Sequence, residues 1–375
     1  MYAVAVIGAN YGDEGKGIMT DYFCRTDAAR VVVRFNGGAQ AGHTVVLPDG
    51  RRHVFSHFGS GTFAKARTYL SRFFVCNPVL YREEYYKLHA MGIIPVTHVH
   101  EDALVTTPFD MLINQFLEHK RGKERHGSCG VGFNETHERN LIAGFRLTVR
   151  DLQHPGELQD LLIRIARVYL PLRANHLKLG FELTESEALD FVTRFLEDCS
   201  FFRSTAIMGP PPEISISDTI IFEGAQGLLL DQHGDGFPHV TRSNTGLQNA
   251  VAVAEEMGVD CMDAIYVSRS YLTRHGAGPL PGESFKPPYA EGLEKETNVD
   301  GPWQGDLRYA PLDVAALNER VLNDWKRHKR PWVSEPMIAV TCCDQVPLNV
   351  APENLGYRSY GPTHEDVRPV PLLDD

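Results

Sequence analysis

Two charged residues in a glycine-rich loop are the first candidates for chemistry. Residues 8–17 read GANYGDEGKG, and they follow an apolar run and precede a segment that can begin a helix. Glycines let backbone N–H groups face an anion, and the ammonium of Lys16 adds a point charge for phosphate oxygens. Asp13 lies in the same loop, where a carboxylate beside a phosphate is repulsive unless a metal or a proton transfer justifies it. The alternative interpretation is a solvated turn that contains a lysine.

The loop differs from the Walker A motif. The interval from Gly8 to Gly15 and Lys16 is two residues longer than that motif allows. Gly17 also stands where a Ser or Thr hydroxyl would bind Mg²⁺. Any phosphate site here is therefore expected to have its own geometry.

Three further segments carry polar side chains among glycines. His43 lies in residues 36–44, and a histidine can donate to a developing oxyanion or phosphoryl group, although a histidine taken alone is more often structural. Gln226 follows an apolar run and carries both a donor and an acceptor, so it can read a purine edge or simply occupy a polar bend. Residues 273–279, TRHGAGP, suit a phosphate or carboxylate, or form a charged surface turn.

Buried strands and amphipathic helices are needed to position these loops. Helical spacing of apolar residues predicts helices over 158–168 and 189–199, the second after a capping box at Thr184 and Glu187. A hairpin is expected across 44–57, and a helix from Gly15. Short β-rich runs predict strands at 2–7, 30–35, 219–222, 264–267 and 337–341.

This alternation predicts an α/β fold with a large, mostly parallel central sheet flanked by helices. Ligands of such sheets bind at the carboxyl ends of the strands. The sequence shows no internal repeat and no long linker, so residues 1–375 are expected to form one domain.

Composition excludes several classes of protein. The chain has 375 residues and a net charge of −11, which does not favour a nucleic-acid partner but leaves room for small phosphorylated ligands. No apolar stretch approaches the roughly 18 residues of a membrane span. The seven cysteines form no CxxC pair, which indicates a reduced, cytoplasmic protein, and adjacent Cys342 and Cys343 lack the second ligand pair of a zinc site.

Taken in order, the motifs resemble those of the adenylosuccinate synthetase family. That family shows GDEGKG, GG-x-NAGHT, FEGAQG-x-LLD, a VTSSNT-like stretch and TRVGxGP. This chain has GDEGKG at 12–17, GGAQAGHT at 37–44, FEGAQGLLLD at 222–231, VTRSNT at 240–245 and TRHGAGP at 273–279. Each motif is moderately specific, and the ordered set, which spans nearly the whole chain, is highly specific.

The resemblance implies a ligase that acts in two steps. The γ-phosphoryl group of a nucleoside triphosphate moves to O6 of a purine nucleoside monophosphate, and the amine of L-aspartate then displaces that phosphate. Asp13 matches the base that removes the N1 proton and also a ligand of Mg²⁺, the implied cofactor, with Gly42 as the second protein ligand. His43 matches the general acid, and Lys16 is the third residue with an expected catalytic role.

The resemblance also implies binding residues. Arg139 is expected to reach a phosphate of the neighbouring subunit in a homodimer, and Thr297 and Arg308 are expected to bind L-aspartate. The nucleoside monophosphate is expected to contact Asn10, Asp13, Gln40, Ser128, Arg139, Gln226 and Thr241. The triphosphate is expected to contact Gly12, Glu14, Gly15, Lys16, Gly17, Gly42, His43, Thr44, Asp344, Gly361 and Pro362.

Some positions depart from the family motifs. Gln40 replaces an asparagine, and in the aspartate-binding run, here 297–313, only Arg308 and Asp313 clearly persist. The guanine-reading K-x-D element keeps Asp344 but has Cys342 in place of lysine. These departures and the short chain resemble the compact phage branch, the 2-aminoadenylosuccinate synthetases, which act on GMP or dGMP and often use ATP or dATP.

Alternatives stay open. Asp13 also fits an IMP-specific enzyme that uses GTP, so IMP is the second candidate substrate. A P-loop-like GTPase or nucleotide sensor would need only the glycines, Lys16 and Asp344, and would leave Gln226 and His43 unexplained. A catalytically inactive family member conflicts with the intact Asp13, Lys16 and His43. A phage-encoded enzyme would work in the host cytoplasm.

Overall fold

A ten-stranded sheet forms the centre of the computed structural model, which describes residues 1–27, 29–283, 303 and 307–371. Every neighbouring pair of strands is parallel except β15 and β16 at one edge. In spatial order the strands are β16 (Val367–Pro369), β15 (Leu355–Ser359), β14 (Met337–Thr341), β11 (Cys261–Arg269), β1 (Tyr2–Gly8), β10 (Thr219–Glu223), β2 (Val31–Arg34), β5 (Arg67–Leu70), β7 (Thr97–Val99) and β9 (Ala206–Met208).

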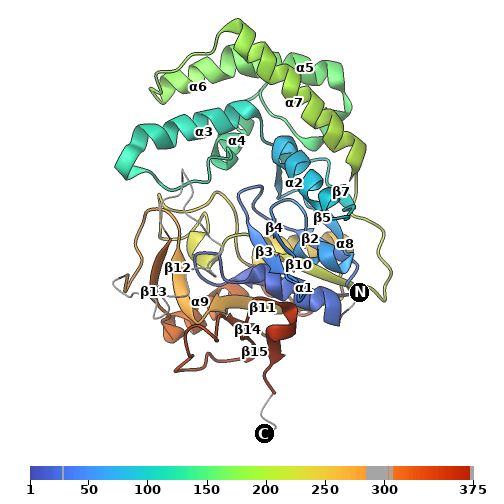
Figure 1. Ribbon diagram of the computed structural model, residues 1–375, viewed down its shortest axis with the longest axis vertical. Helices are drawn as coiled ribbons and strands as arrows, with labels where there is room; N and C mark the ends of the chain where they lie inside the picture. Colours follow the sequence, from blue (N-terminus) through green and yellow to red (C-terminus); the bar gives the residue numbers. More distant parts are fainter. Residues whose placement is uncertain (28, 284–302, 304–306, 372–375) are drawn as a thin grey trace.

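Helices cover both faces of the sheet (Figure 1). Val4 and Val6 of β1 pack into the cluster that contains α1 (Lys16–Thr26). The alternate residues of β1 pack into the cluster that contains α8 (Leu247–Met257) and α9 (Val314–His328). Because successive side chains of a strand point to opposite faces, β1 is buried on both sides, as a central parallel strand must be.

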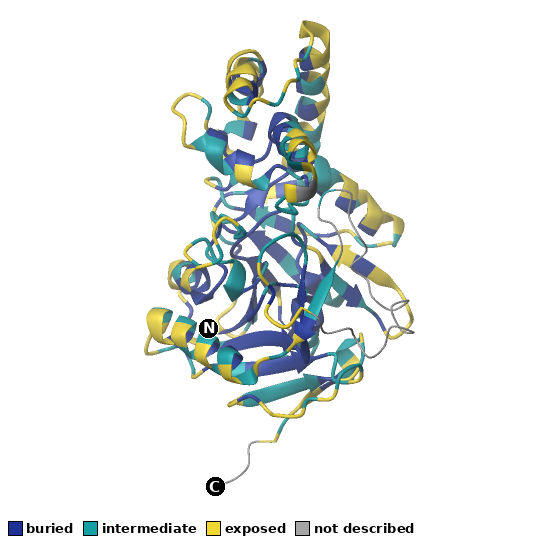
Figure 2. Ribbon diagram, turned by 90° about the vertical axis from the view of Figure 1, so that its left-hand side faces the viewer, coloured by how far each residue is buried: buried dark blue, intermediate teal, exposed yellow. Residues whose placement is uncertain are grey.

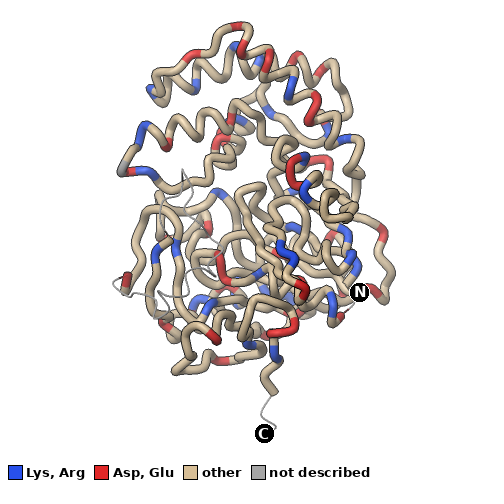
Figure 3. The backbone as a smooth tube through the Cα atoms, viewed as in Figure 1, with Lys and Arg blue, Asp and Glu red and all other residues tan. Residues whose placement is uncertain are grey.

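A helical layer lies beside the edge of the sheet formed by β7 and β9 and above the sheet in Figure 1. One apolar cluster joins these helices to Leu70 of β5 and Val99 of β7. The outward sides of the helices are exposed in Figure 2, and Figure 3 shows basic and acidic residues interspersed along them. The helices are α2 (Pro78–Ala90), α3 (Pro108–Arg121), α4 (Phe133–Asn140), α5 (Pro155–Arg164), α6 (Leu170–His176) and α7 (Glu185–Thr205).

Three short two-stranded pairs complete the strands of the described residues. The hairpin of β3 (His43–Val46) and β4 (Arg52–Phe55) carries His43 at its start. The antiparallel pair of β12 (Tyr271–Arg274) and β13 (Arg308–Pro311) follows β11 directly. The third pair is β6 (Val75–Cys76) with β8 (Leu104–Val105).

The expected fold class is confirmed, and the five predicted strands appear as β1, β2, β10, β11 and β14. The expected hairpin and the Thr184–Glu187 capping box are also present. The helix predicted over 158–168 is present as α5, and it continues through a π-helical turn, Ile165–Tyr169, into α6. Pro171 has no N–H to donate just after this turn, and the altered phase leaves Val168 exposed rather than on the apolar face.

No helix within the described ranges is long and apolar enough to cross a membrane. Among the cysteines, Cys24, Cys76 and Cys199 are buried, and Cys261 is exposed.

A buried ion pair joins α3 to α4. Arg139 and Asp110 are both fully buried, with Nε of Arg139 2.9 Å from Oδ1 of Asp110 and Nη2 2.9 Å from Oδ2. The guanidinium also donates to the carbonyls of Val105 and Phe145. These bonds satisfy the carboxylate, so removing the arginine would leave a buried charge uncompensated.

We expect Arg139→Leu to lower the free energy of unfolding by about 3–5 kcal/mol because Asp110 is then buried without its cation. Urea denaturation followed by circular dichroism measures this. Arg150→Leu is the matched control, since Arg150 is exposed and pairs with Asp102 on the surface; its unfolding midpoint should not change. An equal, small effect of both substitutions would show that Arg139 does not stabilise the fold.

Candidate active site

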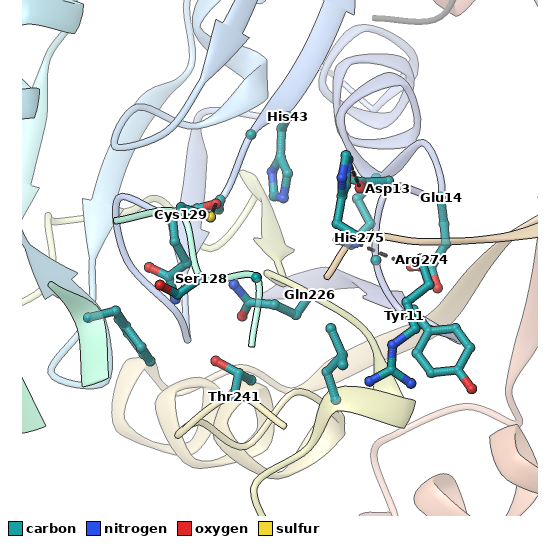
Figure 4. Close-up of a pocket in the computed structure, with 18 of the residues that line it drawn as sticks. Tyr11, Asp13, Glu14, His43, Ser128, Cys129, Gln226, Thr241, Arg274 and His275 are labelled. Atoms are coloured by element: carbon teal, nitrogen blue, oxygen red, sulfur yellow. Dashed lines mark hydrogen bonds and ion pairs between the residues drawn. The ribbon is translucent and has the colours of Figure 1, made fainter. Parts of the chain in front are cut away.

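A cavity of about 1200 Å³ opens at the carboxyl edge of the sheet and extends to α3 and α4. Its walls come from the loops after β1, β2, β10 and β14, from the turn after β12, and from residues 126–138. Figure 4 shows His43, Gln226 and His275 projecting into the same space from separate segments, with Ser128 and Cys129 opposite. The fold therefore places the predicted loops where parallel sheets bind ligands.

The first loop wraps the beginning of α1. A Cβ atom on Gly8 would lie 2.2 Å from the carbonyl oxygen of Gln226, and one on Gly17 would lie 2.7 Å from that of Thr44, so both positions require glycine. Gly15 has a φ of 90° at the N-cap of α1. The free N–H groups of the first helical turn thus face the cavity, as an anion-binding helix start requires.

The charges of this loop are paired. Lys16 Nζ lies 3.3 Å from Oε2 of Glu14, and both side chains are almost fully buried. Burial raises the pKa of the Glu14 carboxyl, although the Lys16 ammonium acts in the opposite direction. Glu14 therefore holds Lys16 at the cavity wall, beside the helix start.

A buried network fixes His43 from behind. Nδ1 of His43 lies 2.8 Å from Oε1 of Glu223, the last residue of β10. The same carboxylate accepts hydrogen bonds from the backbone N–H and hydroxyl of Ser60, and Nε of Arg34 lies 3.8 Å from it. Because Nδ1 faces Glu223, Nε2 is the imidazole nitrogen left for a ligand.

Burial in this network disfavours the charged form of His43. Burial lowers the pKa of His43 below its ordinary value, and Arg34 acts in the same direction. Burial opposes ionisation of Glu223, but the imidazole N–H of His43, the guanidinium of Arg34 and the hydroxyl of Ser60 hold its pKa at about 2. An anionic phosphate placed against Nε2 would raise the pKa of His43 and favour a protonated, donating imidazole.

Two glutamine side chains reach the cavity with unused amide atoms. Both amide atoms of Gln40 and Oε1 of Gln226 are buried without a hydrogen-bond partner. A Cβ on Gly37 would lie 3.3 Å from Oε1 of Gln226 and 3.7 Å from Nε2 of Gln40, so the two amides converge on this glycine. Leaving buried polar atoms unpaired costs about 1–3 kcal/mol each, which a ligand carrying donors and acceptors would offset.

Asp13 presents its carboxylate to the cavity from a left-handed backbone. Its φ is 57°, and its side chain retains 29% exposure. Oδ2 lies 3.4 Å from Nε2 of His275, a residue to which the sequence assigned no individual role. Gln226 and Cys342 also have positive φ values, of 57° and 59°, and both line the cavity.

The fit of Mg²⁺ rests on few protein ligands. In the ranges that the structure describes, no group of three His, Cys, Asp or Glu side chains could hold a metal ion. Asp13 contributes one carboxylate to the cavity wall, and the backbone of Gly42 lies on the same wall. Mg²⁺ is commonly held by one or two carboxylates together with substrate phosphates, so this set suits a metal that arrives with a nucleotide.

Most of the predicted site residues lie on this one cavity. Ser128 lies between α3 and α4, Gln40 follows β2, Gln226 and Thr241 follow β10, and Asp344, Gly361 and Pro362 come from the C-terminal loops. The others that line it are Gly12, Asp13, Glu14, Gly15, Lys16, Gly17, Gly42, His43 and Thr44.

Three predicted residues do not line the cavity. Asn10 is buried and bonds to Ser268 and Arg320. The expected phosphate contact of Arg139 is corrected, because all three of its guanidinium nitrogens donate inside the protein. Arg308 pairs with Glu283 and donates to the carbonyls of Gly276 and Gly278.

Thr297 lies outside the described residues.

Sequence reasoning missed the residues that hold the functional side chains in place. Glu223 lies inside the FEGAQG motif but was not assigned a function. Arg34 offered a signal, because an arginine within the apolar run RVVVRF must be buried against a carboxylate. His275 lay within the TRHGAGP segment, where only a general anion site was expected.

Comparisons with known proteins agree with the motifs. A family model described as adenylosuccinate synthetase matches residues 5–318. The adenylosuccinate synthetase of Polynucleobacter necessarius is 32% identical over 289 residues, which cover 75% of this chain and 63% of that protein. The enzyme of Stenotrophomonas maltophilia is 31% identical over 330 residues, covering 85% of this chain and 74% of the relative. The chain thus spans less than two thirds of the length of the Polynucleobacter necessarius protein.

Two solved structures share the fold. A fully ligated adenylosuccinate synthetase from Plasmodium falciparum has a TM-score of 0.68 at 19% identity, covering 98% of this chain and 86% of that one. The succinoaminodeoxyadenylate synthetase PurZ of cyanophage S-2L, bound to dGMP and dATP as an energy donor, has a TM-score of 0.60 at 18% identity. That alignment covers 99% of this chain and 96% of the phage protein.

We expect His43 to titrate below the ordinary histidine pKa of about 6.5 in the nucleotide-free protein, because burial disfavours its charged form. Glu223→Gln should lower this pKa further, since the carboxylate is the neighbour that favours the imidazolium. Carbon and nitrogen NMR of the histidine rings between pH 5 and 8 measures both, with His43→Asn for assignment. A wild-type pKa at or above 6.5 would contradict the burial argument.

Proposed function

Because the chain belongs to the adenylosuccinate synthetase family, we propose that it joins L-aspartate to C6 of a 6-oxopurine nucleoside monophosphate, with a nucleoside triphosphate driving the step. One observation carries the proposal. A single cavity contains an anion-binding helix start, the carboxylate of Asp13, the buried His43 and the unpartnered amides of Gln40 and Gln226. Together these groups can bind phosphates, hydrogen-bond to a purine edge and transfer a proton.

The chemistry assigns each group a distinct role. A 6-oxopurine is a weak nucleophile at O6 until its N1 proton is removed, and Asp13 takes that proton. O6 then accepts the γ-phosphoryl group, and the nucleoside diphosphate leaves. The amine of L-aspartate attacks C6 and expels inorganic phosphate, which completes the C–N bond. Phosphoryl transfer needs mainly positioning and charge neutralisation, which Lys16, the start of α1 and His43 supply.

Asp13 and the backbone of Gly42 would hold Mg²⁺ that arrives with the phosphates, and the ion would supply positive charge for phosphoryl transfer. The protein's own part is to hold the imidazole of His43 against that group. Glu223 secures Nδ1 at 2.8 Å, so Nε2 can donate to a phosphoryl oxygen once the phosphate has raised the pKa of the ring.

The nucleotide is best assigned as GMP or dGMP, with a 2-aminoadenine nucleotide precursor as the product. The phage PurZ structure binds dGMP and dATP, and this chain aligns with nearly its whole length. Cys342 in place of the guanine-reading lysine supports ATP or dATP as the donor. IMP with GTP is the second candidate, because Asp13 is the residue expected of an IMP enzyme.

The remaining assignments extend the same proposal. Arg308 and Thr297 are the proposed ligands of the L-aspartate carboxylates, and a homodimer of one-domain chains, residues 1–375, is the proposed assembly in the cytoplasm. A nucleotide-sensing GTPase, the alternative from another class, would leave the paired amides and the His43–Glu223 contact without a use. Dependence of phosphate release on aspartate separates the two.

The deciding assay measures phosphate release by the purified chain with Mg²⁺, L-aspartate and ATP or GTP, comparing IMP, GMP and dGMP. We expect turnover that requires aspartate and is at least about tenfold faster with GMP or dGMP than with IMP, a difference of ~1.4 kcal/mol in the barrier. Turnover confined to IMP would reverse the nucleotide assignment. Phosphate release that is indifferent to aspartate would contradict the ligase.

Asp13→Asn tests the proposed base in the same assay. Asparagine matches the size of aspartate and tolerates the left-handed backbone at this position, so the loop should keep its shape. Without a proton acceptor, kcat should fall by about 10³-fold, a loss typical of removing a general base. Asp49→Asn, on an exposed turn, is the matched control. Near-normal turnover of Asp13→Asn would remove Asp13 from this role.

A further inference from the structure

His275 contacts the carboxylate of Asp13 inside the cavity. It follows β12 directly, and its Nε2 lies 3.4 Å from Oδ2 of Asp13. The side chain of His275 is 13% exposed and that of Asp13 is 29% exposed, so the histidine is the more shielded of the two. Figure 4 shows the ring of His275 lying against Asp13, with His43 and Gln226 facing the same space. Moving either side chain by about 0.3 Å would give an ordinary hydrogen bond, and such bonds commonly tighten when a ligand binds.

The backbone on either side of His275 is held firmly. Arg274 donates to the carbonyls of Pro279, at 2.7 Å, and His239, at 3.1 Å. Its guanidinium also lies over the ring of Tyr11, 4.5 Å from the centroid. Gly276 has a φ of 74°, and a Cβ there would come within 2.7 Å of the carbonyl of His126. The ring of His275 is thus presented to Asp13 by an anchored turn.

The surroundings of His275 favour a proton on one of its two ring nitrogens. Nδ1 is buried and has no hydrogen-bond partner. A proton placed on Nδ1 would be a buried donor without an acceptor, whereas a proton on Nε2 faces the carboxylate. The geometry therefore favours a ring that carries a proton on Nε2, which faces Oδ2 of Asp13 at 3.4 Å.

We propose that His275 is a positioning residue for Asp13, an inference that rests on the proposed ligase function. By contacting Oδ2, the imidazole restricts the rotation of the carboxylate and keeps it directed towards the N1 proton of the purine. Without this donor, the carboxylate can turn away from the reacting nitrogen. Because proton removal depends on alignment, the loss falls on kcat, while the nucleotide keeps its contacts with Gln40 and Gln226.

The test compares two substitutions of equal length. His275→Gln keeps an amide N–H near the position of Nε2, and His275→Met fills the same space without a donor. We expect His275→Met to lower kcat about 10- to 100-fold, with the KM of the nucleotide changed less than about threefold. His275→Gln should recover most of kcat. Calorimetric binding of GMP or dGMP should be alike for both variants. His119→Met, on an exposed turn of α3, is the control.

Each outcome separates the inference from the function on which it rests. A wild-type chain without aspartate-dependent phosphate release would overturn the ligase itself. With an active wild type, equal kcat values for the Gln and Met variants would overturn the positioning role, because shape alone would then explain the result. If His275→Met does not fold, His275→Ser replaces it, since a serine hydroxyl is too short to reach Asp13; a kcat within about twofold of wild type would again contradict the inference.

Discussion

The cavity depends on a carboxylate that is wholly enclosed by protein. Glu223 ends β10 directly opposite Val6 of β1 and Arg34 of β2, so the register of three central strands meets at this residue. A buried carboxylate is tolerated only when cations and donors surround it, and Arg34, Ser60 and His43 do so here. The same contacts that make Glu223 tolerable fix the imidazole at the edge of the sheet. The strand register therefore also sets the orientation of His43. A slip of one residue would turn Glu223 to the other face of the sheet, away from the imidazole.

The two walls of the cavity belong to different apolar clusters. The sheet wall packs with α1, α8 and α9, whereas the helical wall packs with α2 to α7. Charged side chains connect the walls. Glu138 of α4 pairs with Arg242 on the loop that carries Thr241. Both residues line the cavity, so this pair joins the two separately packed walls beside the space for a ligand.

Local sequence patterns predicted the central strands and the loops between them. Apolar runs located the strands, and glycines located the loops, because both signals are confined to a few neighbouring residues. Residues whose surroundings come from distant segments could not be placed in this way. The resemblance assigned Arg139 to a phosphate, yet the partner of its guanidinium in the fold is Asp110. The sequence around an arginine does not say whether its side chain binds a ligand or pairs with a buried carboxylate. Only the folded structure distinguishes the two.

Asp13, Gln226 and Cys342 share an uncommon property, since each has a left-handed backbone without being glycine and each lines the cavity. Such a conformation costs a side-chain-bearing residue about 1–2 kcal/mol, and glycine would adopt it freely. Selection for thermal stability alone would therefore favour glycine at these positions. Glycine would raise stability only by removing the side chains that face the ligand. The backbone strain that the chain retains therefore marks positions where thermal stability and chemical function exclude each other.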